Sequence, residues 1–494
     1  MKSLRLSLLS LAALLLTSCM VGPNYSRPEV PMTTAYKESP PAGEGLRPAP
    51  TQSRQGWKVA QPSDQTPRGN WWEIFGDPQL NALEEQVTVA NQDLKAAEAR
   101  FRQARAMIGF ARASEFPTIS TGLGISSVRQ SDNRPFRPST ASGGSSGDFS
   151  LSFDLSYELD LWGRIRRTVT AAREEAQATA ADLQTVQLSL QAELALNYFE
   201  LRSANAQQRL LDDTVKAYTD ALQLTVNRFE GGAAPKSDVA QAQTQLDTTR
   251  VQATDIAVQR AQFEHAIAIL IGQPPATFSL PPAPLNLQAP PIPVGLPAQL
   301  LERRPDIAAA ERRVAEANEQ IGIARAAYYP TVSLGASAGF EGTSISNWLN
   351  WPSLLWSVGL SMTQTLFDAG RRHATSEAAL ANYDALVASY RQTTLTAFQQ
   401  VEDNLAALRV LSQETDQQQQ AVASAQESLE LSTNRYKGGV DTYLQVITAQ
   451  TIALANERNA VDILRRRLDA SVLLIKAIGG GWHVSDLPPL ARAQ

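Results

Sequence analysis

The chain carries two copies of one pattern. Residues 108–120 read IGFARASEFPTIS and residues 321–333 read IGIARAAYYPTVS, with eight of thirteen positions identical at an offset of 213. Asn227–Gly232 and Asn434–Gly439 match in the same way at an offset of 207. Self-similarity at a fixed spacing indicates that two copies of one structural unit build the fold.

Each copy has the same expected order: a helix, two strands split by a loop, a very long helix, a Gly-Gly turn and a shorter helix. The expected division is a lipoprotein signal peptide at 1–18, an anchor and extended segment at 19–70, a first repeat at 77–271, a linker at 272–297, a second repeat at 298–478 and a tail at 479–494. The linker holds nine prolines, so we expect it to be extended.

The long helices set the size of the molecule. Residues 163–230 and 370–437 are 68 residues each, without proline and without glycine after the first position. At 1.5 Å per residue, each helix would be roughly 100 Å long. Such length predicts coiled-coil packing. Apolar and small residues in the second helix recur at alternating spacings of four and three: Tyr383, Val387, Tyr390, Thr394, Ala397, Val401, Asn404, Leu408 and Leu411.

The shorter helices complete this wall. Asp77–Ser114 and Pro235–Ile271 are expected to be helices of 38 and 37 residues, which stacked end to end roughly match the length of one long helix. Further apolar residues (Leu386, Phe398, Leu405) lie off the heptad seam. A helix in a closed ring touches neighbours on two sides, which would use both sets.

The strands give the membrane signal. We expect strands at about 116–130, 148–161, 330–341 and 353–366. Residues 149–161 read FSLSFDLSYELDL, and this alternation places one face in apolar surroundings and the other in water. A transmembrane strand needs about 9–11 residues with this pattern. A half-buried sheet in a soluble domain is the alternative.

Four strands cannot close a barrel, and lipid does not tolerate open sheet edges. A membrane-spanning sheet therefore requires several copies of the chain. Two copies supply 8 strands and three supply 12, and the residues alone leave that choice open.

The N-terminus predicts a lipid anchor. Lys2 and Arg5 precede an apolar stretch, and Leu16-Thr17-Ser18-Cys19 forms a bacterial lipobox. Cys19 is the only cysteine of the chain and is our candidate for acyl (palmitate-type) attachment. The alternative is a plain signal peptide with an incidental cysteine. Met20, rather than an aspartate, after the cysteine favours the outer membrane.

Other functions find little support in the residues. The net charge is −5 with no long basic run, which argues against nucleic-acid binding. His265, His373 and His483 lack metal-ligand spacing, and there is no phosphate loop or nucleophile elbow. We therefore expect no enzyme activity, no cofactor and no metal.

Several motifs, in order, resemble one family. The sequence is similar to the TolC-like outer-membrane factors, in the lipoprotein branch of RND-type tripartite efflux channels (OprM/NodT-like). The motifs that carry the resemblance are Val21–Tyr25, Trp71–Trp72, Phe75–Pro78, Asp160–Arg164, Leu301–Ile307 and Tyr329–Pro330.

The resemblance implies a mainly α fold with a transmembrane β part. It implies a homotrimer that forms a 12-stranded barrel in the outer membrane above a 12-helix periplasmic tunnel. A periplasmic adaptor protein and an inner-membrane RND-type transporter would dock at the helix turns, around 231–236 and 438–443.

The family places its gate at these turns. The candidate gate residues here are Asp238, Arg435, Tyr436 and Asp441, with Arg228 and Lys236 nearby. Relatives in this branch often have an acidic residue where this chain has Thr448, and the counterpart in the first repeat is Gln241. This departure argues against a strong acidic ring at that level.

The sequence thus predicts a passive exit duct for drugs or other small molecules, opened by the adaptor and transporter. The competing hypothesis is a surface-anchored structural lipoprotein with a coiled-coil stalk, which explains the anchor and the helices but leaves the paired alternating strands without a role.

Overall fold

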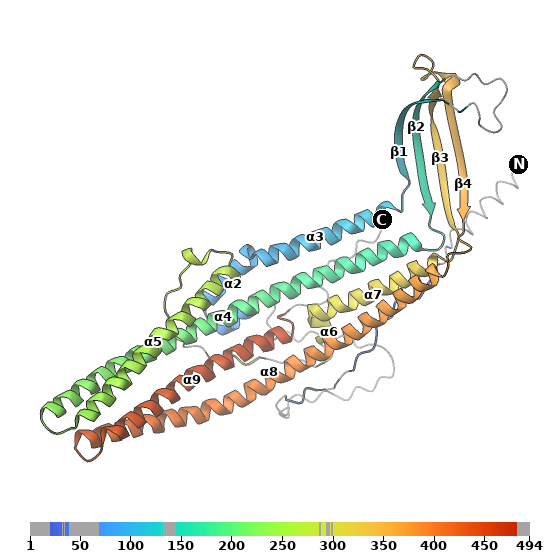
Figure 1. The fold of residues 1–494 in the computed structure, drawn as a ribbon. Helices are drawn as coiled ribbons and strands as arrows, with labels where there is room; N and C mark the ends of the chain where they lie inside the picture. The colour runs from blue at the N-terminus through green and yellow to red at the C-terminus, as the bar shows by residue number, and fades with distance from the viewer. Residues whose placement is uncertain are drawn as a thin grey trace.

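The computed structural model describes residues 20–31, 33, 35–38, 69–129, 131, 145–285, 288–292, 297 and 300–481. The expected signal peptide and the lipid-attachment residue Cys19 lie outside the described residues. The described part is mainly helical, which confirms the expected fold class at that level. It is elongated, with a sheet at one end and two helical hairpin tips at the other (Figure 1).

Two helices of 67 residues form the length of the body: α4 (Arg164–Glu230) and α8 (Arg371–Lys437). The shorter helices pack along them, with α3 and α5 on α4, and α7 and α9 on α8 (Figure 1). Contacts of α4 with α7 and α9 join the two repeats. The remaining helical elements are η1 (Trp71–Phe75), α2 (Pro78–Ala90), α3 (Gln92–Ala113), α5 (Lys236–Leu270), η2 (Pro275–Thr277), α6 (Leu300–Arg303), α7 (Pro305–Ala326), η4 (Trp351–Ser353) and α9 (Tyr443–Ala477).

The first helical stretch is interrupted, so the expectation of one helix over Asp77–Ser114 was wrong. The break is at Asn91, whose backbone is extended (φ −61°, ψ 131°). Its side chain accepts a hydrogen bond from Leu94 N and donates one to Leu270 O. Asparagine is a strong N-cap, so α3 starts anew with its axis redirected toward the sheet.

The predicted heptad seam also drifts. Tyr390, Thr394, Ala397, Val401 and Leu411 are buried as a seam requires. Between them, Leu405 is buried in place of the neighbouring Asn404. A straight helix of 3.6 residues per turn drifts by about 20° per heptad from a strict 3.5 repeat, so a residue beside the seam can become more buried than the seam position itself.

The four strands form one antiparallel sheet in chain order. They are β1 (Thr118–Val128), β2 (Ser146–Leu159), β3 (Thr331–Gly342) and β4 (Leu354–Thr363). The register places apolar residues opposite one another: Ile119 faces Leu155, Leu155 faces Ala336, and Ala336 faces Val358. Directly opposed residues share a face, so one side of the sheet is apolar and the other is dominated by serine and glycine.

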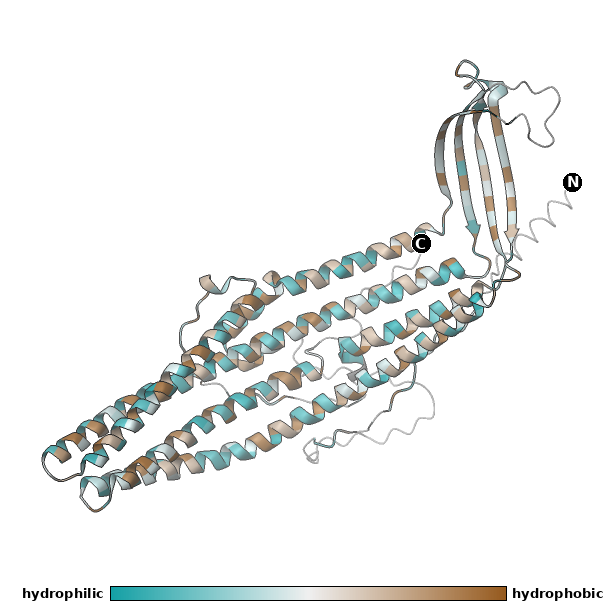
Figure 2. Ribbon diagram, viewed as in Figure 1, coloured by the Kyte–Doolittle hydropathy of each residue, from teal (hydrophilic) through white to brown (hydrophobic). Residues whose placement is uncertain are grey.

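The apolar face of the sheet is exposed in the single chain. Figure 2 shows hydrophobic and hydrophilic residues alternating along the strands. The exposed large apolar side chains on this face are Ile119, Leu123, Ile125, Phe153, Trp356, Val358, Leu360 and Met362. A contiguous exposed apolar surface of this kind marks an interaction with a membrane or with protein.

The main core lies midway along the helices. Trp71, Trp72 and Phe75 of η1 pack with Tyr198 and Phe199 of α4, and α2, α5 and α9 contribute aliphatic residues. The Asp77 side chain caps α2 and accepts a short hydrogen bond (2.5 Å) from the Tyr198 hydroxyl. This core joins helices of both repeats halfway between the sheet and the tips.

Among the described helices, none has a stretch that is apolar and long enough to cross a lipid bilayer.

Candidate gate at the helical tips

The candidate gate residues lie around two turns at the end of the molecule opposite the sheet (Figure 1). Each long helix ends in a Gly-Gly turn in which the second glycine adopts a left-handed backbone, with φ of +70° at Gly232 and +73° at Gly439. In each turn the residue after that glycine donates its N–H back to the helix: Ala233 N to Arg228 O at 2.7 Å and Val440 N to Arg435 O at 3.0 Å. These bonds satisfy carbonyls that would otherwise be orphaned at the helix end.

The second turn is closed by a pair of tyrosines. Tyr436 ends α8 and Tyr443 begins α9, and their ring centroids are 5.1 Å apart. Both rings are buried, together with Ala242 of the first repeat and Val446. Burial, followed by the nearby Tyr436, raises the pKa of the Tyr443 hydroxyl to about 12. Within the described residues the buried Tyr436 hydroxyl has no hydrogen-bond partner.

Arg228 connects the two hairpins. Its guanidinium carbon lies 4.8 Å from the centre of the Tyr436 ring, and its Nη1 donates to Lys437 O at 2.9 Å. The side chain therefore leaves the first repeat and holds the aromatic ring and the helix end of the second. Cation–π and charge-assisted contacts of this kind each contribute on the order of 1 kcal/mol.

Arg435 and Asp441 form an ion pair within the second turn. Arg435 Nε lies 3.1 Å from Asp441 Oδ2, and Thr442 N donates to the other carboxylate oxygen at 3.0 Å. The Arg435 hydrogen bond, followed by that of Thr442, lowers the pKa of Asp441. Asp441 thus acts as a brace across the turn, which fixes the path of the chain into α9.

The fourth candidate lies on the other hairpin. Asp238 is in the first turn of α5 and is close enough to Tyr443 to contribute to the raised pKa of that hydroxyl. The structure therefore brings Arg435, Tyr436 and Asp441 together at one turn and places Asp238 across from them. Thr448 donates its hydroxyl to Leu444 O, and Gln241 is exposed. Because neither side chain is a carboxylate, these two positions supply no acidic ring at that level.

Two members of this cluster were missed by the sequence analysis. Tyr443 and the fully buried Thr225 complete the tyrosine environment. A signal for Tyr443 was present, because Tyr436 and Tyr443 flank the same short turn, where the ends of two antiparallel helices lie side by side. Thr225 gave no signal, because its burial depends on the packing of one repeat against the other.

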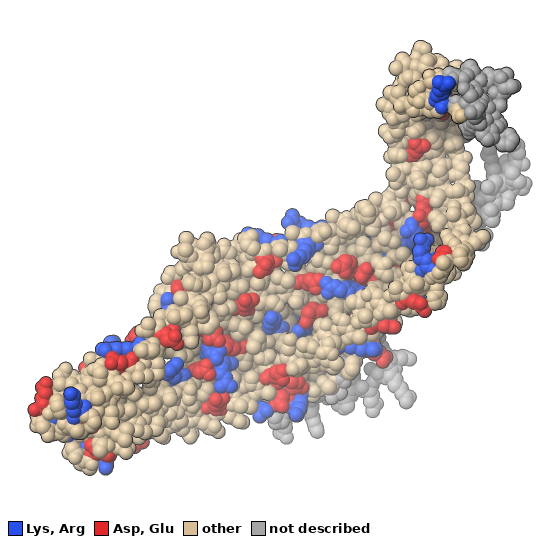
Figure 3. Space-filling model, viewed as in Figure 1, with Lys and Arg blue, Asp and Glu red and all other residues tan. Residues whose placement is uncertain are grey.

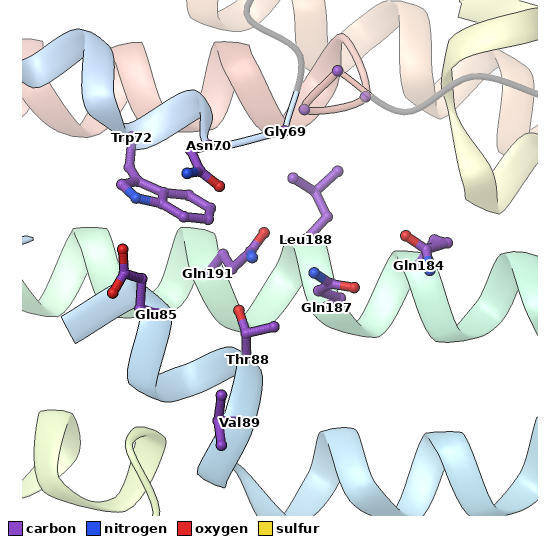
Figure 4. A pocket seen from close by; sticks show the side chains of 13 residues that line it. Gly69, Asn70, Trp72, Glu85, Thr88, Val89, Gln184, Gln187, Leu188 and Gln191 are labelled. Carbon is purple, nitrogen blue, oxygen red and sulfur yellow. The ribbon is translucent and has the colours of Figure 1, made fainter. Parts of the chain in front are cut away.

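Away from the tips, Figure 4 shows a pocket of about 560 Å³ between η1, α2 and α4. Its lining includes the amides of Gln184, Gln187 and Gln191 and one carboxylate, that of Glu85. Such a lining does not hold paired acid and base groups. Nor do the described residues contain a group of three or more histidine, cysteine, aspartate or glutamate side chains arranged to hold a metal.

Charge is unevenly distributed. In the view of Figure 3, lysine, arginine, aspartate and glutamate gather on the helical body, and few lie on the sheet. The division matches the alternation seen in the strands, with an apolar face at one end of the molecule and a polar body at the other.

Comparison with known proteins gives a consistent result. The family described as "Outer membrane efflux protein" matches twice, over residues 83–273 and 296–480. The pyoverdine export outer membrane protein OpmQ of Pseudomonas aeruginosa is 33% identical over 92% of this chain and 95% of its own length. The probable efflux pump outer membrane protein SepC of Pseudomonas putida is 32% identical over 97% of each chain.

Solved structures agree with these relatives. The outer-membrane channel OprN is 29% identical, with a TM-score of 0.82 over 94% of this chain and 100% of its own. The CmeC outer membrane channel of Campylobacter jejuni is 25% identical, with a TM-score of 0.84 over 95% of this chain and 96% of its own. The chain therefore belongs to the outer membrane efflux protein family and is a passive channel rather than an enzyme, the outer-membrane exit duct of a pump that works with an adaptor and an inner-membrane transporter.

Proposed function

We propose that three copies of the chain close into one duct, held in the outer membrane by their sheets and by acyl chains on Cys19, and that an RND-type transporter is the cognate pump. The duct would conduct small molecules from the periplasm to the exterior. The observation that supports this most strongly is the amphipathic sheet with two unpaired edges.

The edges require partners. Within the described residues, β1 pairs only with β2, and β4 pairs only with β3. Each unpaired backbone N–H or C=O in hydrocarbon costs several kcal/mol. Pairing β4 of one copy with β1 of the next removes the edges, and three copies give 12 strands. The apolar face would then point to lipid and the serine and glycine face to the lumen.

The dimensions fit a bilayer. The shortest strand, β4, has 10 residues. At about 3.3 Å per residue and a tilt of ~40° it spans ~25 Å, the height of a barrel's apolar band. Aromatic pairs lie near both ends of the sheet, Trp162 with Tyr329 at 4.8 Å and Phe149 with Trp348 at 6.1 Å. Tryptophan and tyrosine favour membrane–water interfaces.

The helices also require neighbours. On α3, Met107 is half-exposed and Phe110 is 73% exposed, and on α8, Leu395 and Val410 are about half-exposed. In a ring of three copies, α3 and α5 of one copy would lie beside α8 and α9 of the next. The exposed apolar residues would then be covered, in the way that both sides of a helix are used in a closed wall.

The gate would be the tyrosine cluster and the bridge of Arg228. Asp441 with Arg435, and Asp238 across from them, would hold the tips in the closed state until the adaptor and transporter separate them. OpmQ is named for pyoverdine export, and other relatives that are 31–32% identical to this chain are named as outer membrane proteins of toluene, solvent and antibiotic efflux pumps. We infer that this duct also carries small organic molecules, with resistance to toxic compounds as the result.

Crosslinking across the edge strands tests the assembly. Because Cys19 is the only cysteine, single or paired cysteines introduced at the serines of β1 and β4 report on these edges alone. Oxidation of a Ser120→Cys and Ser361→Cys pair, scanned over neighbouring positions for register, should yield a trimer on denaturing gels. Matched pairs on β2 and β3 should crosslink only within one chain. A product that stops at two copies, or the absence of any intermolecular product in membranes, would overturn the trimer.

Conductance tests the channel itself. Purified protein in planar bilayers should give discrete single-channel steps, which a structural stalk protein would not give. Gene deletion should raise sensitivity to exported compounds, and restoration by the Cys19→Ser variant at wild-type level would show that the anchor is dispensable. Mass analysis of the mature N-terminus reports acylation of Cys19 directly.

A further inference from the structure

A buried arginine holds the start of the described chain. Arg167 in the first turn of α4 is 1% exposed. Its Nη1 pairs with Glu319 of α7 at 2.7 Å, its Nε donates to Val21 O at 2.7 Å, and its Nη2 donates to Pro23 O at 3.2 Å. Two of its three partner oxygens thus belong to the backbone of the N-terminal segment, so the guanidinium is satisfied only when that segment is in place.

Glycines let the segment approach. Gly22 has φ of +111°, which disfavours other residues, and a Cβ added there would lie 2.6 Å from the Cα of Gly322. A Cβ on Gly322 would lie 2.3 Å from the Arg167 side chain, and one on Gly163 would lie 2.5 Å from Cγ of Met20. The segment fits only because these three positions lack side chains.

Polar contacts complete the site. Val21 N donates to Trp162 O at 3.1 Å, and the Asn318 side chain donates to Pro23 O at 3.2 Å. We call Trp162, Arg167, Asn318, Glu319 and Gly322 the N-terminal socket. It is built from the turn between β2 and α4, the first turn of α4 and the second half of α7, so the segment bridges the two repeats directly below the sheet.

We propose that the N-terminal socket is a binding site for the mature N-terminus, which fixes the height of the lipid anchor relative to the sheet. The proposal rests on acylation of Cys19. Met20 lies against Gly163, the residue after Trp162 of the socket, and residue 19 precedes Met20 by one peptide bond, which joins Cα atoms about 3.8 Å apart. The acyl chains would therefore enter lipid at the level of Trp162, not at the end of a free tether.

The socket coincides with an expected membrane boundary. The Trp162 indole stacks on Tyr329 and donates to Pro330 O at 2.7 Å, so its ring is fixed at the inner end of the sheet. Amphipathic aromatic rings prefer the interfacial layer of a bilayer. The aromatic pair and the docked N-terminus thus meet at Trp162 and define one plane, and this plane sets how far the helical body projects from the membrane.

The contacts beyond the socket make the segment a continuous strap. The Tyr25 hydroxyl donates to Glu311 at 2.5 Å, Arg27 donates to the Tyr390 hydroxyl at 3.2 Å, and Lys37 N donates to Glu402 at 2.7 Å. These residues follow α7 and then α8 toward the tips. A strap held only by these later contacts would leave the first residues free, so the proposal depends on the socket itself.

Fluorescence quenching tests the socket. In the acylated protein, Met20→Cys supplies the single free thiol for a bimane label, which tryptophan quenches on contact. The label should be quenched by Trp162 in the parent, and Trp162→Phe should remove that quenching. Gly22→Ala and Arg167→Met should also lose the quenching, whereas Gly69→Ala should keep it. Gly69 is the matched control, because it too has a positive φ of +84° but a Cβ added there would have no other heavy atom within 4 Å.

The outcomes separate the socket from the anchor. Quenching that survives Gly22→Ala and Arg167→Met in folded trimers would overturn the socket. If Gly22→Ala fails to fold, Arg167→Lys, which keeps the charge but reaches fewer acceptors, should show partial loss of quenching, and full quenching there would equally overturn it. Quenching retained in an unacylated protein would leave the socket in place while refuting the anchor. With spin-labelled lipids, the label should be quenched from one shallow depth in the parent and from a broad range of depths in Gly22→Ala.

Discussion

The two hairpin tips derive from the same repeated segment but are closed by different contacts. At the offset of 207, Phe229 of the first tip corresponds to Tyr436 of the second. Phe229 is 42% exposed, whereas Tyr436 is 4% exposed and packs against Tyr443. Lys236 stands where the second tip has Tyr443, so the first tip lacks the aromatic partner across its turn.

The two equivalent arginines differ in the same way. Arg435 remains within its own turn and pairs with Asp441, while Arg228 reaches across to the other hairpin. Ala234 occupies the position that corresponds to Asp441, so Arg228 lacks a carboxylate at the position where Arg435 finds its partner. The two repeats thus share one backbone arrangement at their tips. A few residue differences let Arg228 of the first tip contact the second, whereas Arg435 of the second tip pairs within its own turn.

The largest expected effect is the loss of the buried ring. Tyr436→Ala removes an aromatic side chain from a packed cluster, which costs about 3 kcal/mol or more. The tips should open, with faster amide exchange at the end of α8 and the start of α9 and a higher open probability in planar bilayers. Phe229→Ala, at the equivalent exposed position, should change exchange and conductance little. Equal effects of the two variants would contradict the asymmetry.

Loss of the bridge between the hairpins comes next. Arg228→Gln removes the charge over the Tyr436 ring and weakens the bond to Lys437 O, a loss of about 1–2 kcal/mol. Conductance should rise less than in Tyr436→Ala. The double variant should show less than the sum of the two single effects, because both residues contribute to one contact. Strict additivity in this double-mutant cycle would show that Arg228 acts elsewhere.

The elements that the two repeats share could be predicted from the sequence, but the difference between the two tips could not. Helix lengths followed from the absence of proline and glycine, and strand faces followed from strict alternation, because both depend on local periodicity. Arg435, Tyr436 and Asp441 were candidates from the sequence because they flank a recognisable Gly-Gly turn, and whether they form a gate stays a prediction. The direction in which Arg228 points, the burial of Thr225 and the break at Asn91 were not found, because each depends on contact between segments far apart in the chain.

The same limit applies to the sheet end of the molecule. The role of Arg167 was invisible in sequence, where it is one of several arginines that follow Gly163. Its burial and its three partners arise only when α4, α7 and the N-terminal segment meet. Repeated segments are easy to detect in a sequence. The contacts between the two repeats are not, because the residues that make them differ from one repeat to the other.

The smallest expected effect concerns the ion pair of the second turn. Because the pKa of Asp441 is lowered in the folded chain, the pair adds stability above the carboxyl's ordinary pKa, and this contribution is lost as the pH falls through the lowered value. Asp441→Asn should therefore weaken the tip modestly at pH 7, measured as amide exchange at the start of α9, and should differ from the parent less as the pH falls below about 4.

Two further experiments test this ion pair: high salt, and a carboxylate introduced at the equivalent position of the first tip. Arg435 is largely exposed, so high salt should reduce the difference between the parent and Asp441→Asn, since salt weakens the attraction within a solvent-exposed ion pair. The variant Ala234→Asp places a carboxylate at the equivalent position of the first tip. It should not form a second ion pair, because Arg228 already contacts Tyr436 and Lys437. If the new carboxylate instead draws Arg228 away from the Tyr436 ring, conductance should rise as it does in Arg228→Gln. That result would show that closure of the second tip depends on the absence of a carboxylate at position 234.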